Sequence, residues 1–365
     1  MVRVLHVVTY MGRGGLETML MNYYRNIDRS KVQFDFLCHR DFEADYDSEI
    51  LSLGGRIYRL PNLNPFSKTY LNALESFFAK HNEYKIVHSH IDCMSAIPLK
   101  YAKKYGVPVT IAHSHSKSQD KDIKYPIKLL AKRFIPKYAN YLFSCGKEAG
   151  DWMFSGKKYT IINNAIDAEK YRYNEVNGNM IRKEFGILYD EIVIGHVGRF
   201  NPPKNHSFIV DVFNSIHKKN NKTKLVLVGT GDGQVNIKQK VKEYNLEDNV
   251  LFLGNRNDVD KVLQCMDVFL FPSLYEGLPL SILEAQAAGL PCIISNNVPK
   301  ECIKTDRVFQ YDLNESMDFW SGKVLEAAKI RKKDTVEEII KTGFDIKKNA
   351  KDLQEFYTSF TAIGG

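Results

Sequence analysis

The sequence predicts an α/β protein built from two domains, each with a parallel sheet. Apolar runs typical of buried strands alternate with amphipathic segments typical of helices along the whole chain. A polar stretch near the middle interrupts this alternation, which then restarts. The 365 residues are enough for two full cores. Two sets of six or seven strands fit two Rossmann-like domains better than one very wide sheet.

The strands can be placed in order along the chain. In the first domain we expect them at residues 3–9, 33–38, 56–60, 86–90, 107–113, 141–145 and 159–163, with amphipathic helices that include 16–27 and 71–80. In the second domain we expect them at 192–198, 225–229, 250–254, 268–272, 292–295 and 308–311. The boundary should fall within 163–178, where the periodicity is lost. This gives domains 1–165 and 166–345, followed by a last helix at 346–360.

Composition excludes several classes of protein. The chain has no run of about 18 apolar residues, and its first residues enter a strand at once, unlike a signal peptide. The six cysteines are scattered without a metal-binding spacing, as expected of reduced thiols in a cytoplasmic protein. The net charge of +8 suggests anionic partners but does not separate nucleic acid, acidic lipid and nucleotide phosphate.

Two glutamates mark the strongest candidate site. Glu276 should lie on the loop after the strand at 268–272, and Glu284 about one turn into the next helix, for which Pro279 is the expected first residue. The carboxyl edge of such a sheet is where ligands bind. A helix N-terminus at this edge attracts phosphate. The acids are therefore expected to bind hydroxyls, such as those of a sugar and a ribose.

A glycine-rich turn follows the first strand, from Gly12 through Gly14 and Gly15 to Glu17 at the start of a helix. Glycines there let backbone N–H groups approach an anion closely. The spacing is not that of a dinucleotide site, which argues against a nicotinamide cofactor. A purely structural turn is about as frequent an explanation.

Two cations follow the first strand of the second domain. Arg199 and Lys204 lie on the loop after 192–198, where permanent positive charge can neutralise a diphosphate. Solvated loop cations are the alternative explanation, but the position at the sheet edge favours a binding role.

Histidine pairs end two strands of the first domain, His88-Ser89-His90 and His113-Ser114-His115. At that edge they should line a binding site. Metal binding is the less favoured alternative because Asp92 is the one nearby carboxylate in the sequence. A structural role for one pair remains open. Three D-x-D patterns, at 45–47, 120–122 and 258–260, do not directly end an apolar strand, so we expect no metal site there.

Residues 117–137 are basic. Lysines recur at 124, 128 and 132, while Ile123, Ile127, Leu130 and Phe134 recur at the spacing of an apolar helix face. A solvated basic face above an ordinary core helix is the favoured interpretation. Contact with an anionic membrane surface is the alternative.

Taken together, residues 4–360 resemble glycosyltransferase family 4, the retaining nucleotide-sugar transferases of GT-B fold, and especially members that build bacterial exopolysaccharide and capsule. The matching elements are Gly14-Gly15-Leu16-Glu17, Ala112-His113-Ser114-His115, Val197-Gly198-Arg199 with Lys204, and the pair Glu276 and Glu284, which forms the family's E-x(7)-E element. The resemblance implies two domains that face each other across a cleft, with the C-terminal helix 346–365 packed back on the first domain. The first domain would then bind the acceptor and the second the nucleotide sugar.

The resemblance also implies roles for individual residues. Glu284 would hold the ribose and Glu276 the donor sugar, while Arg199 and Lys204 would stabilise the departing diphosphate. His113 would lie near the anomeric carbon, with His115 as the second choice. The remaining implied contacts are Gly14, Gly15, Gly277, Leu278 and Pro279 on the donor, and Glu17, His90 and His115 on the acceptor side. The chain departs from the family at Asn164-Ala165, where Asn-Gly is usual, and at Gly277-Leu278-Pro279, where Gly-Phe-Gly is frequent.

The implied reaction is transfer of a hexose or N-acetylhexosamine, with retention, from a nucleotide sugar to a growing glycan. We expect a UDP-sugar as donor and an undecaprenyl-diphosphate-linked acceptor at the cytoplasmic face, with no metal, no further cofactor and no nucleic-acid partner. The usual retaining route needs a carboxylate nucleophile, which the sequence does not identify, so front-face attack is favoured. Two alternatives remain: a nucleotide-sugar epimerase of similar fold, and a non-catalytic subunit that binds nucleotide sugar.

Overall fold

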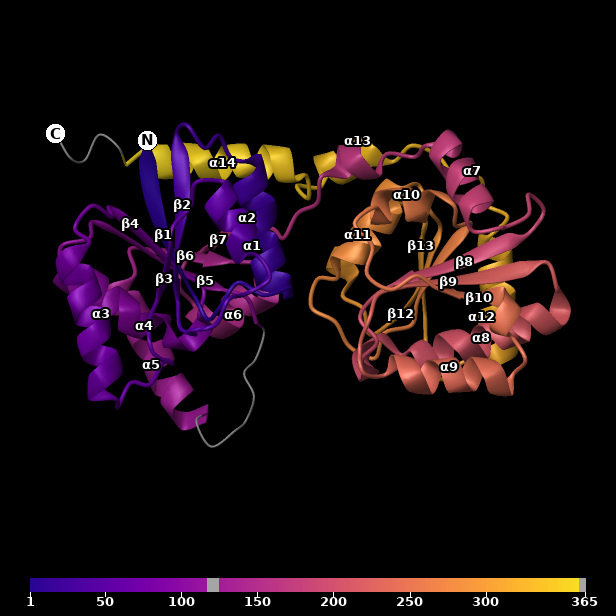
Figure 1. Cartoon of the computed structure of the whole chain (residues 1–365), viewed down its shortest axis with the longest axis horizontal. Helices are drawn as coiled ribbons and strands as arrows, with labels where there is room; N and C mark the ends of the chain where they lie inside the picture. Colours follow the sequence, from indigo (N-terminus) through magenta and orange to yellow (C-terminus); the bar gives the residue numbers. More distant parts are fainter. Residues whose placement is uncertain (117–124, 361–365) are drawn as a thin grey trace. The chain divides into compact units, whose positions relative to one another are not determined.

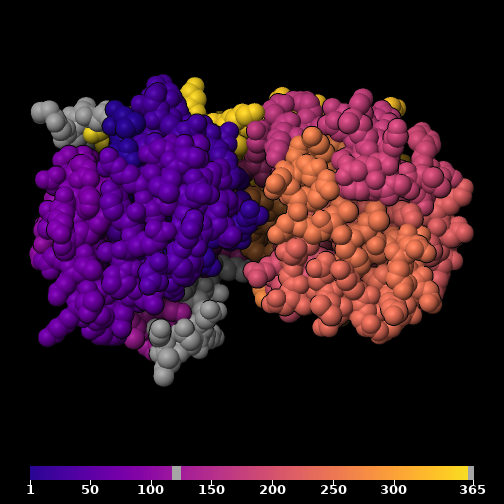
Figure 2. Space-filling model, in the orientation of Figure 1, coloured from indigo at the N-terminus to yellow at the C-terminus, as the bar shows by residue number. Residues whose placement is uncertain are grey.

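The computed structural model describes residues 1–116 and 125–360, and it divides the chain into two units (Figure 1). The N-terminal unit consists of Met1–Ala165 together with Ile346–Gly365, and the C-terminal unit consists of Ile166–Asp345. Each unit has its own sheet and its own hydrophobic clusters. Figure 2 shows one face of both units with their side chains. The α/β fold class is confirmed.

The N-terminal unit contains a seven-stranded parallel sheet in the order β3-β2-β1-β4-β5-β6-β7. Its strands are β1 (Val2–Val8), β2 (Val32–Cys38), β3 (Ile57–Arg59), β4 (Ile86–Ser89), β5 (Val109–Ser114), β6 (Tyr141–Ser144) and β7 (Thr160–Ile161). Its helices are α1 (Gly15–Asn26), α2 (Asp47–Ser52), α3 (Lys68–Lys80), α4 (Ala96–Lys104), α5 (Tyr125–Tyr138), α6 (Lys147–Phe154) and α14 (Ile346–Thr358).

Helices cover both faces of this sheet because successive side chains of a strand point to opposite faces. In β1, Val4 and Val8 pack in the cluster that contains α1 and α14. Leu5 and Val7 pack in the opposite cluster, with α3 and α4. His6 shares the face of Val4 and Val8, so its ring points into the layer that α14 completes.

The C-terminal unit contains a six-stranded parallel sheet in the order β10-β9-β8-β11-β12-β13. Its strands are β8 (Ile192–Val197), β9 (Thr223–Val228), β10 (Val250–Phe252), β11 (Val268–Phe271), β12 (Cys292–Ser295) and β13 (Val308–Tyr311). One face is covered by α7 (Glu175–Glu184), α10 (Val259–Gln264) and α11 (Leu280–Ala287), and the other by α8 (His206–Lys219), α9 (Gln234–Glu243) and α12 (Met317–Ala327). A short helix, α13 (Val336–Lys341), precedes the return to the N-terminal unit.

Both sheets reverse their strand order beside their first strand. In the N-terminal unit the reversal lies between β1 and β4, and in the C-terminal unit between β8 and β11. In open parallel sheets such a reversal separates the loops at the carboxyl ends of the strands and leaves a crevice where ligands bind. The loops after β1, β4, β8 and β11 are therefore the places to look for a site.

The thirteen predicted strands all occur, most of them ending one or two residues earlier than expected because residues such as Gly198 and Pro272 belong to the loops. Pro279 is the N-cap of α11 and not its first residue, so that prediction was wrong by one position. The predicted apolar face of the basic segment was also wrong: Ile135 is the buried residue of α5, and Leu130 and Phe134 are exposed. Residues 117–124 of that segment, which include Lys124 and Ile123, lie outside the described residues. None of the described helices has the length and apolarity to cross a membrane.

Substitution of two glycines by alanine should change the stability in opposite directions. Gly289, after α11, has φ of +72°, and a Cβ there would lie 2.0 Å from the Lys333 carbonyl oxygen. Gly289→Ala should therefore lower the free energy of unfolding by about 1–3 kcal/mol from strain alone. Gly322 lies inside α12, and a Cβ added there would meet no atom within 4 Å. Gly322→Ala should raise the free energy of unfolding by about 0.5–1 kcal/mol. Urea unfolding checks both values, and shifts of the same sign would contradict this explanation.

Candidate active site

Lys204 and Glu276 form an ion pair at the reversal point of the C-terminal sheet. Lys204 ends a short 3-10 helix after β8, and Glu276 lies on the loop after the neighbouring strand β11. Nζ of Lys204 donates to Oε1 of Glu276 at 2.7 Å, and the side chains are only 17% and 11% exposed. The ammonium also lies 4.6 Å from the centre of the Phe271 ring. Both charges were predicted to act here, but their contact with each other was not.

Arg199 adds a second positive charge to the same loop. Its side chain is exposed, and its guanidinium makes no hydrogen bond or ion pair with any residue in the described part of the chain. The loop around it is closely packed, since a Cβ on Gly229 would lie 2.2 Å from the Gly198 carbonyl oxygen. The loop after β8 thus carries one cation, Lys204, that is paired with a carboxylate, and one, Arg199, that has no partner within residues 1–116 and 125–360.

Glu284 lies in the second turn of α11, and its carboxylate accepts a hydrogen bond from the Tyr171 hydroxyl at Oε1, 2.9 Å away. Burial raises the pKa of Glu284, while the bond from Tyr171 and the charge of Lys170 lower it. No residue in the described ranges donates to Oε2, which remains able to accept from a ligand hydroxyl. Tyr171 was not anticipated, because it ends a short 3-10 helix, Ala168–Tyr171, in the segment between the two sheets where the sequence has no periodicity.

Two glycines at the predicted site are required neither by backbone conformation nor by packing. Gly277 and Gly15 both lack a positive φ, and a Cβ on either would meet no atom within 4 Å. Glycine at such positions permits close approach of another molecule to the backbone. Leu278 packs into the apolar clusters below its loop.

The glycine turn of the N-terminal unit leads into α1, whose N-cap is Gly14. The carboxylate of half-buried Glu17 lies against Gly14 at this end of the helix. The contact is so close that a Cβ on Gly14 would lie 2.2 Å from Oε2 of Glu17. Burial raises the pKa of Glu17. The helix end therefore combines exposed backbone N–H groups with a nearby carboxyl that has an increased tendency to be protonated.

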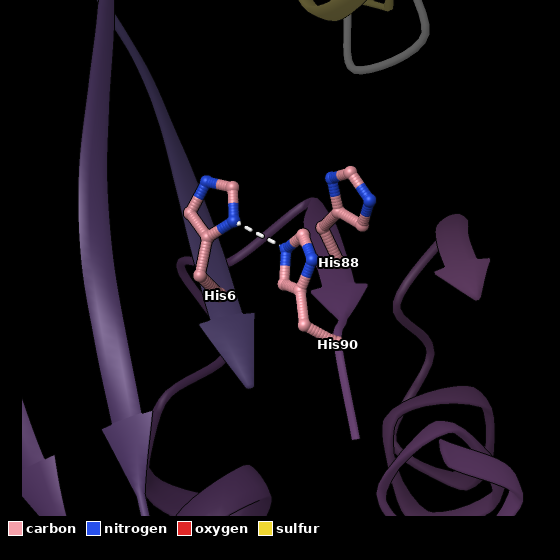
Figure 3. A group of neighbouring side chains, drawn as sticks. All are labelled: His6, His88 and His90. Atoms are coloured by element: carbon pink, nitrogen blue, oxygen red, sulfur yellow. Dashed lines mark hydrogen bonds between the residues drawn. The ribbon is translucent and has the colours of Figure 1, made fainter. Parts of the chain in front are cut away.

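The two histidine pairs lie together on one face of the N-terminal sheet, and His6 joins them. In the sheet register His6 lies beside His88, and Ser89 lies beside Ala112, so all five rings come from three adjacent strands and the residues that directly follow them. Nδ1 of His6 lies 2.9 Å from Nε2 of His90 (Figure 3). Nδ1 of His90 lies 3.0 Å from Nε2 of His115, and Nε2 of His88 lies 3.2 Å from Nδ1 of His113. The sequence pattern indicated the pairs at the sheet edge but gave no sign of His6, which occupies an apolar strand.

Burial keeps this cluster uncharged. It lowers the pKa of His6 and of His115 to about 3, and the pKa values of His88, His90 and His113 well below the usual value. Four of the rings are at most 2% exposed, and His115 is half-buried. Neutral imidazoles carry one N–H and one bare nitrogen each, so they can satisfy one another.

The cluster also contains two groups of three rings, His6, His88 and His90 and His90, His113 and His115, that offer nitrogen atoms within 4.8 Å of one another. Two nitrogens bound to one tetrahedral zinc would be about 3.3 Å apart. The N···N distances of 2.9 and 3.0 Å are shorter than this and are those of an N–H of one ring that donates to the bare nitrogen of the next. Ring-to-ring hydrogen bonds therefore account for the spacing, and the expectation of no metal stays a prediction.

The neutral histidines make stability depend on pH. Folding lowers the pKa values of these histidines, so the folded protein keeps its full stability above pH 6.5 and loses stability as the pH falls below that value. Each histidine should lower the free energy of unfolding by about 1.4 kcal/mol when the pH falls from 7.5 to 5.5. His6→Phe, whose new ring would pack beside Phe34 and Phe36, should flatten the pH dependence by about one such increment. Urea midpoints across this range test it; parallel curves for the two proteins would refute it.

Comparison with known proteins assigns the family. Residues 13–170 match the model described as glycosyltransferase family 4, and residues 179–306 match that of glycosyl transferases group 1. The chain is 35% identical to EpsF of Bacillus subtilis, named as a glycosyltransferase, over 98% of this chain and 97% of that one. It is 26% identical to the UDP-Gal:α-D-GlcNAc-diphosphoundecaprenol α-1,3-galactosyltransferase of Escherichia coli, over 98% and 96%.

A solved structure shows the same fold. HepE from Anabaena, in complex with UDP, superposes with a TM-score of 0.80 at 16% identity, over 98% of this chain and all of that one. The names of these two relatives from Bacillus subtilis and Escherichia coli specify glycosyl transfer, so neither the epimerase nor the non-catalytic subunit is favoured. The chain belongs to the family 4 glycosyltransferases, has their GT-B fold, and is a glycosyltransferase.

Proposed function

We propose that the protein transfers a hexose or N-acetylhexosamine from a UDP-sugar, with retention, to an undecaprenyl-diphosphate-linked glycan during exopolysaccharide or capsule synthesis at the cytoplasmic face. The proposal depends above all on the Lys204–Glu276 pair and on Arg199, which lies on the same loop as Lys204 and has no partner among the described residues. The relative from Escherichia coli supports it, because its name specifies a UDP-sugar and a diphosphoundecaprenol acceptor.

In this proposal the C-terminal unit holds the donor. Arg199 and Lys204 neutralise the diphosphate, and Glu276, which in the free protein accepts from Lys204, accepts from hydroxyls of the sugar. The free Oε2 of Glu284 binds the ribose hydroxyls while Tyr171 fixes the carboxylate through Oε1. The open backbone at Gly277 lets the sugar approach. In the N-terminal unit His113, with His90, His115 and Glu17 nearby, is proposed to serve the reacting centre and the acceptor.

The reaction then needs no nucleophile from the protein. The bond from the anomeric carbon to the diphosphate oxygen breaks, and the acceptor oxygen forms its bond on the same face. The acceptor proton passes to the departing phosphate. In this proposal Glu276 is not the nucleophile, because its carboxylate accepts from hydroxyls of the donor sugar. The two cations, together with helix N-termini, offset the charge that develops on the leaving group without a metal.

Turnover of UDP-sugars with a diphosphoprenyl-linked glycan in excess chelator tests this proposal. We expect undiminished activity and a product of retained anomeric configuration. Lys204→Ala should lower kcat/KM by about 10²-fold or more, because a preorganised charge is lost from the transition state. Lys240→Ala, which breaks a comparable ion pair with Asp211 elsewhere in the same unit, is the matched control and should leave kcat/KM unchanged. Full dependence on added metal, or an inverted product, would overturn the proposal.

We also propose that α5 meets an anionic membrane surface, where a lipid-linked acceptor would be found. Leu130 and Phe134, one turn apart, are 56% and 44% exposed. Arg133 and Lys137 are exposed on the same helix. Exposed apolar side chains among basic ones are typical of helices that lie in the membrane interface.

Vesicle cosedimentation tests the membrane proposal. The protein should bind vesicles that contain anionic phospholipid and not purely zwitterionic ones, and binding should weaken as salt rises. Leu130→Ser with Phe134→Ser should reduce binding at least about tenfold. As a control, Val235→Ser removes an exposed apolar residue from α9 and should have no effect. Equal vesicle binding by the double variant and by Val235→Ser would contradict the membrane proposal.

A further inference from the structure

A chain of hydrogen bonds connects the last helix to His113. The Tyr357 hydroxyl, on α14, lies 2.7 Å from Nδ1 of His88, and Nε2 of His88 lies 3.2 Å from Nδ1 of His113. The chain ends at Nε2 of His113, a buried atom without a hydrogen-bond partner among the described residues. Tyr357 and His88 are separated by 269 positions in the sequence, so the return of α14 to the N-terminal unit creates this connection.

The protons in such a chain move together. Burial lowers the pKa values of both His88 and His113 well below the usual value, so each ring is neutral and has a single N–H. In one arrangement Tyr357 donates to His88, His88 donates to His113, and His113 keeps its proton on Nε2. In the other, every bond is reversed: His113 donates to His88, His88 donates to the Tyr357 oxygen, and Nε2 of His113 is bare.

Tyr357 decides between the two arrangements. Its hydroxyl is fully buried, and Nδ1 of His88 is its one hydrogen-bond partner within residues 1–116 and 125–360. In the reversed arrangement the phenolic proton would therefore have no acceptor. A buried hydroxyl with an unmade hydrogen bond shifts an equilibrium of this kind by about tenfold or more.

The second chain through the cluster does not impose this choice on His113. It runs from His6 through His90 to His115, whose ring is half-buried and can exchange protons with solvent. Figure 3 shows that the ring of His6 turns toward His90 and not toward His88. His115 stacks on His113 with ring centres 4.1 Å apart, so it contacts His113 by its face.

We propose that Tyr357 and His88 are positioning residues that hold His113 as the Nε2–H tautomer, so that His113 offers the substrate a hydrogen-bond donor and not a base. Its role toward substrate rests on the proposed function: the unpartnered N–H meets a hydroxyl or phosphate oxygen. In that reaction the departing phosphate takes the acceptor proton, so a base on His113 is not needed. A fixed donor, by contrast, stabilises negative charge on oxygen as it develops.

The tautomer can be read without any activity. In full-length protein labelled with ¹⁵N at its ten histidines, long-range ¹H–¹⁵N correlations distinguish the protonated ring nitrogen from the bare one. The His113 signals are identified by their absence from His113→Gln. We expect Nε2 of His113 to be the protonated nitrogen in the unmodified protein. A proton mainly on Nδ1, or on both nitrogens, would overturn the proposal.

Removing the hydroxyl tests the cause. In Tyr357→Phe the Nε2–H form should fall from about nine-tenths or more to about half, since the tenfold bias is lost. Tyr23→Phe is the matched control: it removes another buried hydroxyl, which donates to the Asn163 carbonyl oxygen, and should leave the His113 signals unchanged. An unchanged tautomer in Tyr357→Phe would refute the assignment even if the unmodified protein has the expected form.

Kinetics separate the donor role from the function itself. The Gln amide N–H can replace the Nε2–H group, so His113→Gln should keep kcat/KM within about tenfold, while His113→Asn and His113→Ala should lose about 10²-fold. Tyr357→Phe should lower kcat with little change in KM. Equal losses in the three His113 variants would refute the donor role. Absence of transferase activity in the unmodified protein would refute the proposed function and leave the spectroscopic result standing.

Discussion

Each sheet has its first strand in the interior, and this placement determines where both candidate binding edges lie. Because β1 and β8 are interior, the chain must add strands on one side and then cross to the other. The crossing separates the loops at the carboxyl edge and leaves room there for a ligand. Gly14 and His90 follow the strands at one reversal point, and Arg199, Lys204 and Glu276 follow the strands at the other. Residues distant in sequence thus share one sheet edge without any special local sequence.

The polar side chains at these edges are held in place by hydrogen bonds and an ion pair among themselves. Lys204 engages Glu276, Tyr171 engages Glu284, and the histidines engage one another and Tyr357. A buried polar group without such a partner is costly, so the pairs both stabilise the fold and fix the orientation of the groups. Beside these contacts, four groups remain unpaired within the described residues: the guanidinium of Arg199, Oε2 of Glu284, Nε2 of His113 and Nε2 of His6. The ring of His6 packs beside Phe34 and Phe36, and the other three groups are the ones proposed to bind a ligand.

The sequence was sufficient for the parallel sheets, because buried strands such as β11 are continuous apolar runs and the helices between them have a clear period. It was also sufficient for the loops that carry Glu276 and Lys204, since these follow directly from the strand ends. It was insufficient where a contact depends on segments that meet only in the fold. In the sequence, Tyr171 is one residue of a segment without periodicity, and Tyr357 is one residue on the face of the last helix. His6 is a single polar residue within an apolar strand, and no pattern links it to the other histidines. The exposed Leu130 and Phe134 show the same limit, because helical spacing predicts that apolar residues share one face of a helix but not that this face is buried.

We propose that the reversal point of the C-terminal sheet binds the nucleotide diphosphate through Lys204 and the ribose through Glu284. Calorimetric titration of UDP into the unmodified protein, Lys204→Ala and Glu284→Gln measures both contacts. We predict saturable one-to-one binding by the unmodified protein and a loss of at least about tenfold in affinity, about 1.4 kcal/mol, in each variant. Asp211→Asn, which disturbs an ion pair elsewhere in the same unit, should bind as the unmodified protein does. Unchanged affinity in both Lys204→Ala and Glu284→Gln would contradict the claim.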